Sequence, residues 1–297
     1  MDVVTARALT KRYAGKAAID HADMHVPAGA IYGFVGRNGA GKSTMMKMIA
    51  GLVSPDGGEL TVFGGNRTHR IGVLIEAPGL LPNLSAFDTL MTLALAQGLP
   101  DPMAECRNLL VQVGLDGVGG RAAKGFSLGM KQRLGLAMAL LGGPDLLLLD
   151  EPLNGLDPEG AREIRNLLVE LNRTRGITIV ISSHVLDQLE RMCTHYGVIA
   201  SGRIVREITA EQVEAECRQS LTLRTADTAR TLAILEERVG GSVRFAAEPD
   251  GSLIVSGGFE TAEIARILHE TNQEVLEMSV NHKDREEYFL GAMGGER

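Results

Sequence analysis

Short apolar runs and segments of helical periodicity alternate over roughly the first 210 residues of the chain. Three of the runs, at 30–36, 145–151 and 177–184, are almost continuously apolar, which is typical of strands in a sheet covered on both faces. A fourth run, 196–205, is divided by a serine–glycine pair and predicts a hairpin. The alternation predicts an α/β core built on a mainly parallel sheet.

A mostly helical stretch, roughly 77–142, lies between the first two of these strands. Helical patterns at 84–96, 103–113 and 130–141 are separated by segments rich in proline and glycine. We therefore expect a helical subdomain inserted into the α/β core, within an N-terminal domain that covers 1–212.

The pattern changes after about residue 213. A strand, a helix, a hairpin around Pro249-Asp250-Gly251, a second helix and a last strand follow in turn. This β-α-β-β-α-β order is that of ferredoxin-like folds and predicts a small α+β domain over 213–297. Because the segment contains no glycine-rich phosphate loop, cysteine cluster or histidine pair, we expect an accessory domain for packing or dimer contacts.

Composition narrows the possible partners. The 297 residues are 44% hydrophobic and 23% charged, as in ordinary soluble globular proteins. A net charge of −7 without a basic block argues against nucleic acid as a partner. Three scattered cysteines indicate a reducing compartment without a disulfide framework. No signal peptide is evident and no apolar run approaches the ~18 residues of a membrane span, so we expect action at a membrane only through a partner.

The segment GRNGAGKST fits the pattern G-x-x-x-x-G-K-[ST] directly after a predicted strand and before a predicted helix. Its glycines let backbone N–H groups converge on phosphate oxygens, and Lys42 adds a positive charge. The Ser43 hydroxyl can bind Mg²⁺, and Thr44 adds another hydroxyl. We expect a nucleotide phosphate loop; the alternative is a glycine-rich turn that binds nothing. The candidate nucleotide-binding residues are Gly36, Arg37, Asn38, Gly39, Ala40, Gly41, Lys42, Ser43 and Thr44.

Two adjacent acids end the predicted strand at 145–151, at the edge where open α/β sheets bind ligands. Asp150 is suited to hold the metal, directly or through water, and Glu151 to orient or deprotonate an attacking water. Acids often end strands, so the pair alone is a weak signal. It becomes specific because a metal bound by Ser43 needs a carboxylate opposite.

The segment FSLGMKQRLG (126–135) predicts a helix whose bare N-terminal N–H groups form a second anion site. With the residues that follow it, up to 158, this segment resembles the nucleotide-binding domain of ABC transporters. The resemblance covers roughly 3–210 and implies a P-loop NTPase (ABC ATPase) core. In that family two domains pair head to tail, and each γ-phosphate lies between one P-loop and the opposite signature helix. The resemblance thus implies ATP, Mg²⁺ and a homodimer.

Within this resemblance, Ser127 and Gly129 match the serine and the second glycine of the family's LSGGQ signature. Leu128 and Met130 replace its first glycine and its glutamine, which leaves contacts beyond the γ-phosphate open. An ordinary N-capped helix would explain Ser127, but it would not explain the position of the segment just before the second acidic motif.

Three further residues match the family individually. Tyr13 lies where the family stacks an aromatic ring on adenine, although it could equally be an edge-strand tyrosine. His184 matches the switch histidine that touches the γ-phosphate, and a polar loop residue is the alternative. Asp157 matches the loop that crosses the dimer interface, and a turn aspartate before a proline is the alternative.

Glu76 occupies the position of the family's Q-loop glutamine. A carboxylate adds negative charge near Asp150 and Glu151 and loses the amide donor, so we expect it to strengthen metal attraction; neutral drift is the alternative. The segment from Glu76 to residue 86, with the signature, resembles the ATPase subunits of lantibiotic-immunity exporters. The loop after Glu76 would then receive a membrane subunit.

The resemblance implies an ATP-hydrolysing subunit at the cytoplasmic face of the membrane. It would dimerise head to tail and power a separately encoded permease that exports a lantibiotic-like peptide or hydrophobic antibiotic. One rival is a soluble ABC ATPase acting on ribosomes or nucleic acid, but such chains resemble tandem duplications or carry long coiled-coil insertions, and neither is evident. A small-molecule P-loop kinase would lack the signature and the switch histidine.

Overall fold

The computed structural model of the protein describes residues 1–66, 68–217, 220–239, 243–281 and 285–294. Contacts within the chain separate two units, one that contains Met1–Ala210 and one that contains Glu211–Leu290. Of the described residues at the end of the chain, 291–294 group with the first unit. The division into domains at 212 and 213 stays a prediction.

The first unit is built on a six-stranded sheet with the order β5-β6-β7-β3-β8-β9. Its strands are β3 (Ile31–Val35), β5 (Ile71–Leu74), β6 (Leu146–Asp150), β7 (Thr178–Ser183), β8 (His195–Ala200) and β9 (Arg203–Thr209). The strands from β5 to β8 are parallel, and β9 returns antiparallel to β8 in the expected hairpin. Every residue of β3, β6 and β7 is buried, as their apolar sequences require. The predicted α/β core is confirmed.

A separate three-stranded antiparallel sheet, which the sequence analysis missed, precedes and follows β3 in the chain. It contains β1 (Asp2–Tyr13), β2 (Lys16–Pro27) and β4 (Gly57–Val62) in the order β2-β1-β4. Register shifts interrupt the pairing of β1 with both neighbours. Such bulges break the strict alternation by which a half-buried strand is recognised.

The helix α1 (Lys42–Ile49) shares one core with both sheets. Met45 and Met46 of α1, Leu9 of β1, and Phe34 and Leu148 of the large sheet are all fully buried in this core. Each such side chain contributes roughly 1.5–3 kcal/mol through removal from water. The phosphate-loop segment that leads into α1 therefore stands on a rigid base.

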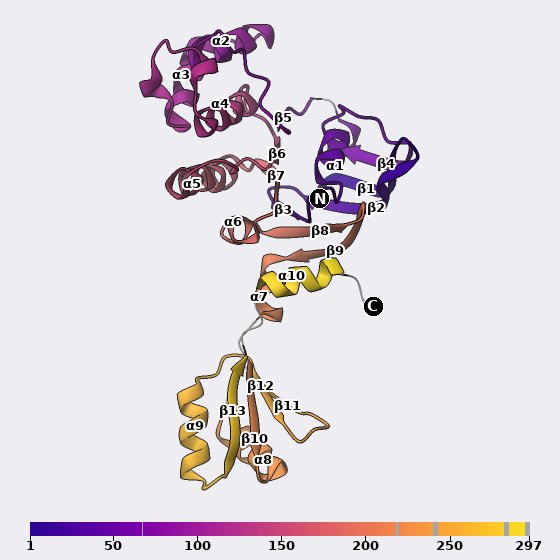
Figure 1. The fold of residues 1–297 in the computed structure, drawn as a ribbon, viewed down its shortest axis with the longest axis vertical. Helices are drawn as coiled ribbons and strands as arrows, with labels where there is room; N and C mark the ends of the chain where they lie inside the picture. The colour runs from indigo at the N-terminus through magenta and orange to yellow at the C-terminus, as the bar shows by residue number, and fades with distance from the viewer. Residues whose placement is uncertain (67, 218–219, 240–242, 282–284, 295–297) are drawn as a thin grey trace. The chain divides into compact units, whose positions relative to one another are not determined.

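The inserted segment is helical, as expected. It contains α2 (Ala86–Ala96), α3 (Pro102–Gln112) and α4 (Leu128–Leu140), with single 3₁₀ turns at Asp116–Val118 and Ala123–Gly125. Figure 1 shows the three helices gathered together beyond β5. Local side-chain caps set their starts: Ser85, Asp101 and Ser127 accept from backbone N–H groups three residues later.

The remaining elements of the first unit flank the strands. A 3₁₀ turn (Phe63–Gly65) follows β4, α5 (Pro158–Arg175) precedes β7, and α6 (Leu186–Glu190) follows it. Helix α5 begins with a proline in its first turn and ends at Gly176 in the left-handed conformation, φ 68°. Both signals are local, which explains why this long helix is well delimited.

The second unit contains a four-stranded antiparallel sheet with the order β11-β12-β10-β13. The elements that follow β9, in chain order, are α7 (Ala210–Glu216), β10 (Ser220–Thr225), α8 (Thr228–Arg238), β11 (Arg244–Ala247), β12 (Leu253–Ser256), α9 (Thr261–Glu270), β13 (Val275–Asn281) and α10 (Arg285–Gly294). The first residue of α7 and the last residues of α10 group with the first unit. Leu221 and Leu223 of β10 pack with residues of β12, α8 and α9 in one core. From β10 to β13 the order is the predicted ferredoxin-like one, which is confirmed.

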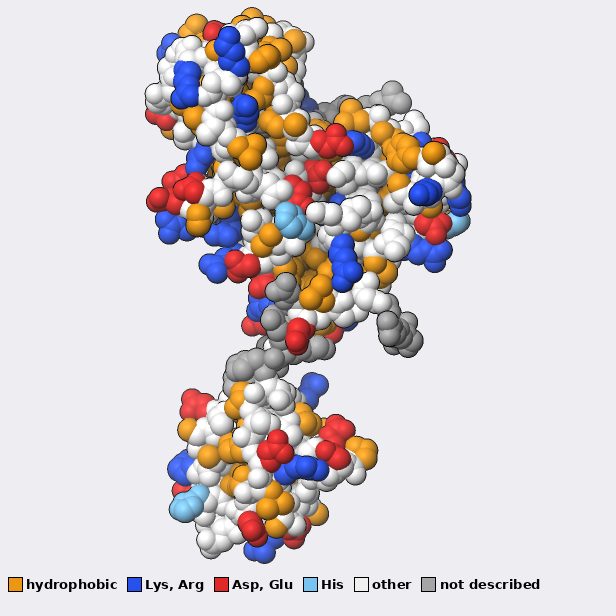
Figure 2. Space-filling view, in the orientation of Figure 1, with side chains coloured by type: hydrophobic (Ala, Val, Ile, Leu, Met, Phe, Trp, Pro, Cys, Tyr) orange, Lys and Arg blue, Asp and Glu red, His pale blue; other side chains and the backbone are white. Residues whose placement is uncertain are grey.

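Acidic and basic side chains are interspersed on the face of the molecule in Figure 2. Across the part of the chain that the structure describes, no helix combines the length and apolar character that a membrane span requires.

Candidate nucleotide site

The predicted phosphate loop lies between β3 and α1, at the carboxyl end of the strand. Gly41 has a φ of 114°, a conformation that L side chains rarely adopt. A Cβ at Gly41 would lie 2.6 Å from the carbonyl oxygen of Ala18, and one at Gly36 would lie 2.6 Å from Cγ2 of Ile199. The two glycines are therefore required by the backbone path of the loop.

Lys42 is held inside this loop. Its side chain is only 6% exposed, and Nζ donates to the carbonyl oxygens of Gly36, at 2.7 Å, and Arg37, at 3.3 Å. Burial lowers the pKa of Lys42 below its usual value, while the charges of Glu151 and Asp150 act in the opposite direction. The ammonium group is thus positioned in the loop and needs little rearrangement to meet a phosphate.

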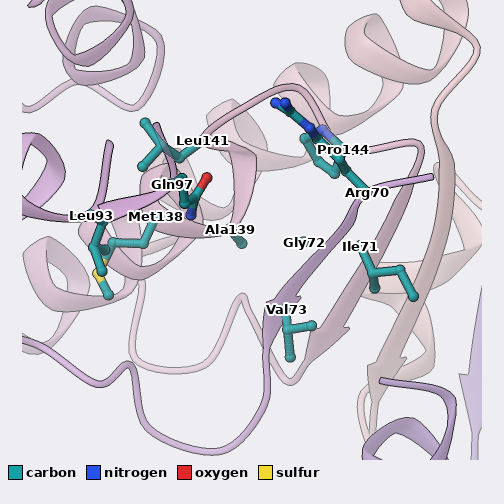
Figure 3. A pocket seen from close by; sticks show the side chains of 10 residues that line it. All are labelled: Arg70, Ile71, Gly72, Val73, Leu93, Gln97, Met138, Ala139, Leu141 and Pro144. Carbon is teal, nitrogen blue, oxygen red and sulfur yellow. The ribbon is translucent and has the colours of Figure 1, made fainter. Parts of the chain in front are cut away.

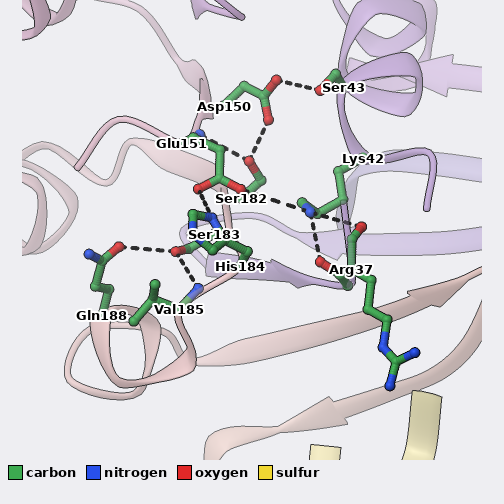
Figure 4. Close-up of polar contacts among 11 residues, drawn as sticks. Arg37, Lys42, Ser43, Asp150, Glu151, Ser182, Ser183, His184, Val185 and Gln188 are labelled. Atoms are coloured by element: carbon green, nitrogen blue, oxygen red, sulfur yellow. Dashed lines mark hydrogen bonds and ion pairs between the residues drawn. The ribbon is translucent and has the colours of Figure 1, made fainter. Parts of the chain in front are cut away.

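Asp150 connects the phosphate loop to the strand ends (Figure 4). One carboxylate oxygen, Oδ2, accepts from the Ser43 hydroxyl at 2.5 Å, and the other, Oδ1, accepts from the Ser182 hydroxyl at 2.5 Å. Ser182 is the register partner of Asp150 on β7 and is fully buried. The expected neighbourhood of Ser43 and Asp150 is therefore present, and Ser182 is an additional polar residue that sequence reasoning missed.

Glu151 lies between Lys42 and His184. Its Oε2 lies 2.8 Å from Nδ1 of His184, and its Oε1 lies 3.9 Å from Nζ of Lys42. The Glu151 backbone is left-handed, with φ 52°, and its N–H donates to the Ser182 hydroxyl at 3.0 Å. A non-glycine residue in this conformation costs on the order of 1–3 kcal/mol, and such strain clusters at functional sites.

The turn after β7 aims His184 at this carboxylate. The Ser183 hydroxyl accepts from the backbone N–H of Val185 at 3.0 Å and donates to Oε1 of Gln188 at 3.0 Å. Figure 4 shows His184 and Glu151 facing one another from the ends of neighbouring strands. The sequence predicted His184 for this site, but its hydrogen bond to Glu151 is visible only in the structure.

A cavity of about 210 Å³ lies at the junction of these elements. Its lining residues are Ala18, Asn38, Gly39, Gly41, Lys42, Ser43, Thr44, Asp150 and Glu151. The structure therefore brings most of the predicted phosphate loop and both predicted acids to one opening, although they are more than one hundred residues apart in the chain.

The oxygen atoms at this opening are suited to bind Mg²⁺ together with the phosphates of a nucleotide. Over the described residues, no group of three or more histidine, cysteine or acidic side chains could hold a metal by itself. Ser43 and Asp150 instead offer one hydroxyl and one carboxylate in direct contact. Mg²⁺ prefers oxygen ligands and commonly takes one or two carboxylates together with substrate phosphates. These two side chains would supply the protein's part of such a site.

The predicted signature residues form a different cluster, and none of them lines this cavity. Ser127 is exposed and caps α4 by accepting from the N–H of Met130 at 3.2 Å. A Cβ at Gly129 would lie 3.1 Å from Cδ2 of Leu156, so Gly129 permits close packing on the loop before α5. Asp157 is exposed in that loop. The cluster of Ser127, Gly129 and Asp157 is called the signature surface below.

A second cavity, of about 510 Å³, lies between β5 and the ends of α2 and α4 (Figure 3). Its lining residues are Arg70, Ile71, Gly72, Val73, Leu93, Gln97, Met138, Ala139, Leu141 and Pro144. This lining includes no predicted site residue and no acidic side chain. The cavity is therefore separate from the nucleotide opening.

Comparisons with known proteins agree with this geometry. Residues 19–154 match the family described as ABC transporter. The bacitracin transport ATP-binding protein BcrA of Bacillus licheniformis is 36% identical, over 97% of this chain and 96% of its own. The chain belongs to the ABC transporter family. The lantibiotic transport ATP-binding protein SrtF of Streptococcus pyogenes is 42% identical over 67% of this chain and 87% of its own.

Solved structures show the same fold. The structure of cbiO1 from Clostridium perfringens, part of the ABC transporter complex cbiONQ, has a TM-score of 0.64 and 28% identity. It covers 72% of this chain and 91% of that one. The predicted resemblance to an ABC ATPase is thereby confirmed. The chain is an ATP-binding, ATP-hydrolysing subunit of a transporter.

Tyr13 and Glu76 are among the predicted residues of this ABC ATPase that do not line the cavity. The Tyr13 ring is about half exposed, and the ammonium of Lys11 lies 5.5 Å from its centre. The Glu76 side chain is 64% exposed and bonds to Nζ of Lys47 at 2.5 Å. Lys47 was not among the predicted residues. The signal available in the sequence was that Lys47 follows Ser43 by four residues in a predicted helix, which places both side chains on one face.

Proposed function

We propose that two copies of this chain pair head to tail, so that each ATP lies between the phosphate loop of one copy and the signature surface of the other. Within one chain, the loop and the acids surround a cavity that Ser127 and Gly129 do not line. Ser127 and Asp157 are exposed and available to a second copy. The separation of these two sets of phosphate-binding groups is the observation that carries the proposal.

In this proposal Lys42 places its charge on the β- and γ-phosphates, and Ser43 and Asp150 hold Mg²⁺. Bound Mg²⁺ would neutralise phosphate charge as the terminal phosphoryl group is transferred. Release of Lys42 toward the phosphate leaves Glu151 with one oxygen free of a close partner. Glu151 then accepts a proton as the water oxygen bonds to the γ-phosphorus and the bond to the bridging oxygen breaks.

His184 has a supporting role in this step. Its Nδ1 is 2.8 Å from Glu151, which fixes the ring, and its other nitrogen is free to approach the γ-phosphate. Hydrogen bonds within the turn after β7 hold the histidine in place. Hydrolysis removes the phosphate that joins the two copies, and the dimer opens.

The proposed substrate and membrane partner are based on the similarity of this chain to known transport ATP-binding proteins. BcrA and SrtF are described as bacitracin and lantibiotic transport proteins, and this chain is similar to both. We therefore infer a separately encoded permease at the cytoplasmic face of the membrane and a peptide antibiotic as the exported substrate. The loop after Glu76, with the exposed Leu81, would receive the permease.

The first test replaces Glu151 with glutamine, which keeps the shape and removes the proton acceptor. We expect Glu151→Gln to bind ATP, to accumulate as a dimer in size-exclusion chromatography with light scattering, and to lose at least about 100-fold in turnover. Glu159→Gln, an exposed carboxylate on α5, is the matched control and should behave as wild type. Wild-type turnover in Glu151→Gln would remove Glu151 from its proposed role.

A second test addresses the partner. Solubilised membranes that contain the tagged chain should yield a complex with a multi-span protein. Recovery of the chain on ribosomes instead would contradict the transport proposal and support a soluble ABC ATPase.

A further inference from the structure

A close ion pair links the phosphate-loop helix to the position where the ABC family usually carries glutamine. Nζ of Lys47, on α1, donates to Oε1 of Glu76 at 2.5 Å. Lys47 lies four residues, about one helical turn, after Ser43. Glu76 follows the end of β5 by two residues. The pair therefore joins the element that binds the metal to the loop after β5.

Two carboxylates, those of Glu76 and Asp150, act electrostatically on Lys47. The hydrogen bond to Glu76 raises the pKa of Lys47 above its usual value against a smaller effect of burial, and the negative charges of Glu76 and Asp150 also raise it. Asp150 is the carboxylate that contacts Ser43. Lys47 is thus within electrostatic reach of both Glu76 and the metal-binding carboxylate.

The positive charge of Lys47 offsets the negative charge that Glu76 introduces. A carboxylate in place of an amide adds one negative charge next to Lys47, on which the charge of Asp150 also acts. The positive charge of Lys47 cancels it, so that Glu76 and Lys47 together are as neutral as the family's glutamine. The Glu76 backbone is also left-handed, φ 61°, as is that of Glu151. Such outliers are concentrated at functional positions.

We propose that Lys47 is a positioning residue which holds the Glu76 carboxylate away from the Ser43–Asp150 pair, and that Glu76 exchanges Lys47 for the metal site when nucleotide and Mg²⁺ bind. This inference rests on the proposed metal role of Ser43 and Asp150. The ammonium 2.5 Å from Oε1 neutralises the Glu76 carboxylate and would repel a divalent cation bound by the same group. Lys47 and the metal site therefore compete for Glu76.

The competition predicts how metal affinity responds to each side chain. Lys47→Met frees Glu76 and is expected to tighten divalent-metal binding about tenfold, on the order of 1.4 kcal/mol. Glu76→Gln removes the carboxylate for which Lys47 and the metal compete, so adding Lys47→Met to it should change metal affinity less than about twofold, through the charge of Lys47 alone. Lys47→Arg retains a cation in the same place and should keep wild-type affinity.

The experiment measures Mn²⁺ binding by electron paramagnetic resonance titration, on the full chain with a non-hydrolysable ATP analogue. Wild type, Lys47→Met, Glu76→Gln and the double variant form a double-mutant cycle. Arg266→Met, which removes an exposed ion pair with Glu270 on α9 of the other unit, is the control and should change nothing. The proposal is supported if Lys47→Met acts only when residue 76 is glutamate.

Two other outcomes have separate meanings. If Lys47→Met changes Mn²⁺ affinity by the same factor with glutamate and with glutamine at position 76, the competition does not exist and the proposal is wrong. If Asp150→Asn leaves Mn²⁺ binding unchanged, the metal does not bind at Ser43 and Asp150. That result would contradict the metal site in the proposed function, whatever the effect of Lys47→Met.

Discussion

The nucleotide opening and the signature surface are both expected to contact phosphate, yet they are built differently. Lys42, Asp150 and Ser182 are at least nine-tenths buried and are held by short hydrogen bonds. Ser127 and Asp157 are exposed, and the hydroxyl of Ser127 serves as a local helix cap. One region is assembled by the tertiary structure of a single chain, whereas the other is a surface that is complete only against a second copy.

The largest expected effect comes from two variants, one impaired in the nucleotide opening and the other in the signature surface. Lys42→Met removes the loop charge, and Ser127→Glu places a carboxylate where the signature would meet phosphate. Each variant alone should lose on the order of 10²–10³ in ATP turnover. A mixture of the two should recover turnover, because a heterodimer contains one intact loop opposite one intact signature.

The matched control for this mixture carries both substitutions on the same chain. That chain alone has no intact site and should stay inactive at every concentration. Failure of the mixture to recover turnover, with heterodimers shown to form by tagged pull-down, would argue that the signature surface does not contact a partner's ATP.

A smaller effect probes the rigidity of the buried region. Ser182→Ala removes the hydroxyl that donates to Asp150 and leaves the buried Oδ1 of Asp150 without that donor, while the Glu151 N–H keeps the carbonyl oxygen of Ser182. We expect the free energy of unfolding in urea to fall by about 1–3 kcal/mol and turnover to fall about tenfold. Ser54→Ala, an exposed serine, is the control. Unchanged turnover would show that Asp150 does not need this support.

The smallest effect concerns the packing of the signature surface. Leu128, the departure from the family's first signature glycine, is 61% exposed and covers Gly155, whose φ is 74°. A Cβ at Gly155 would overlap the Leu128 side chain. Gly155→Ala should therefore weaken ATP-dependent dimerisation several-fold, as measured by analytical ultracentrifugation.

Adding Leu128→Gly to Gly155→Ala tests the cause of this weakening. The second substitution removes the overlap and should restore part of the dimerisation. Recovery stays incomplete because alanine at this φ retains a strain of roughly 1–2 kcal/mol. No recovery at all would assign the defect to the backbone of Gly155 and leave Leu128 without a packing role.

The elements that the sequence analysis recognised are those whose signals are local. Continuous apolar runs identified β3, β6 and β7, and helical patterns identified α2, α3 and α4. The three-stranded sheet was missed because bulges in β1 disturb its alternation. Ser182 was missed because only the pairing of β6 with β7 places it against Asp150.

The amino-acid sequence by itself determined the family, the phosphate loop and the acidic strand end, because each depends on residue type at fixed spacing along a strand–turn–helix segment. Tertiary structure decided which charges meet. The parallel register brings Glu151 to His184, and the path from β5 brings Glu76 to Lys47. Such pairings join residues about thirty positions apart through the sheet or the core, so no periodicity in the chain could reveal them.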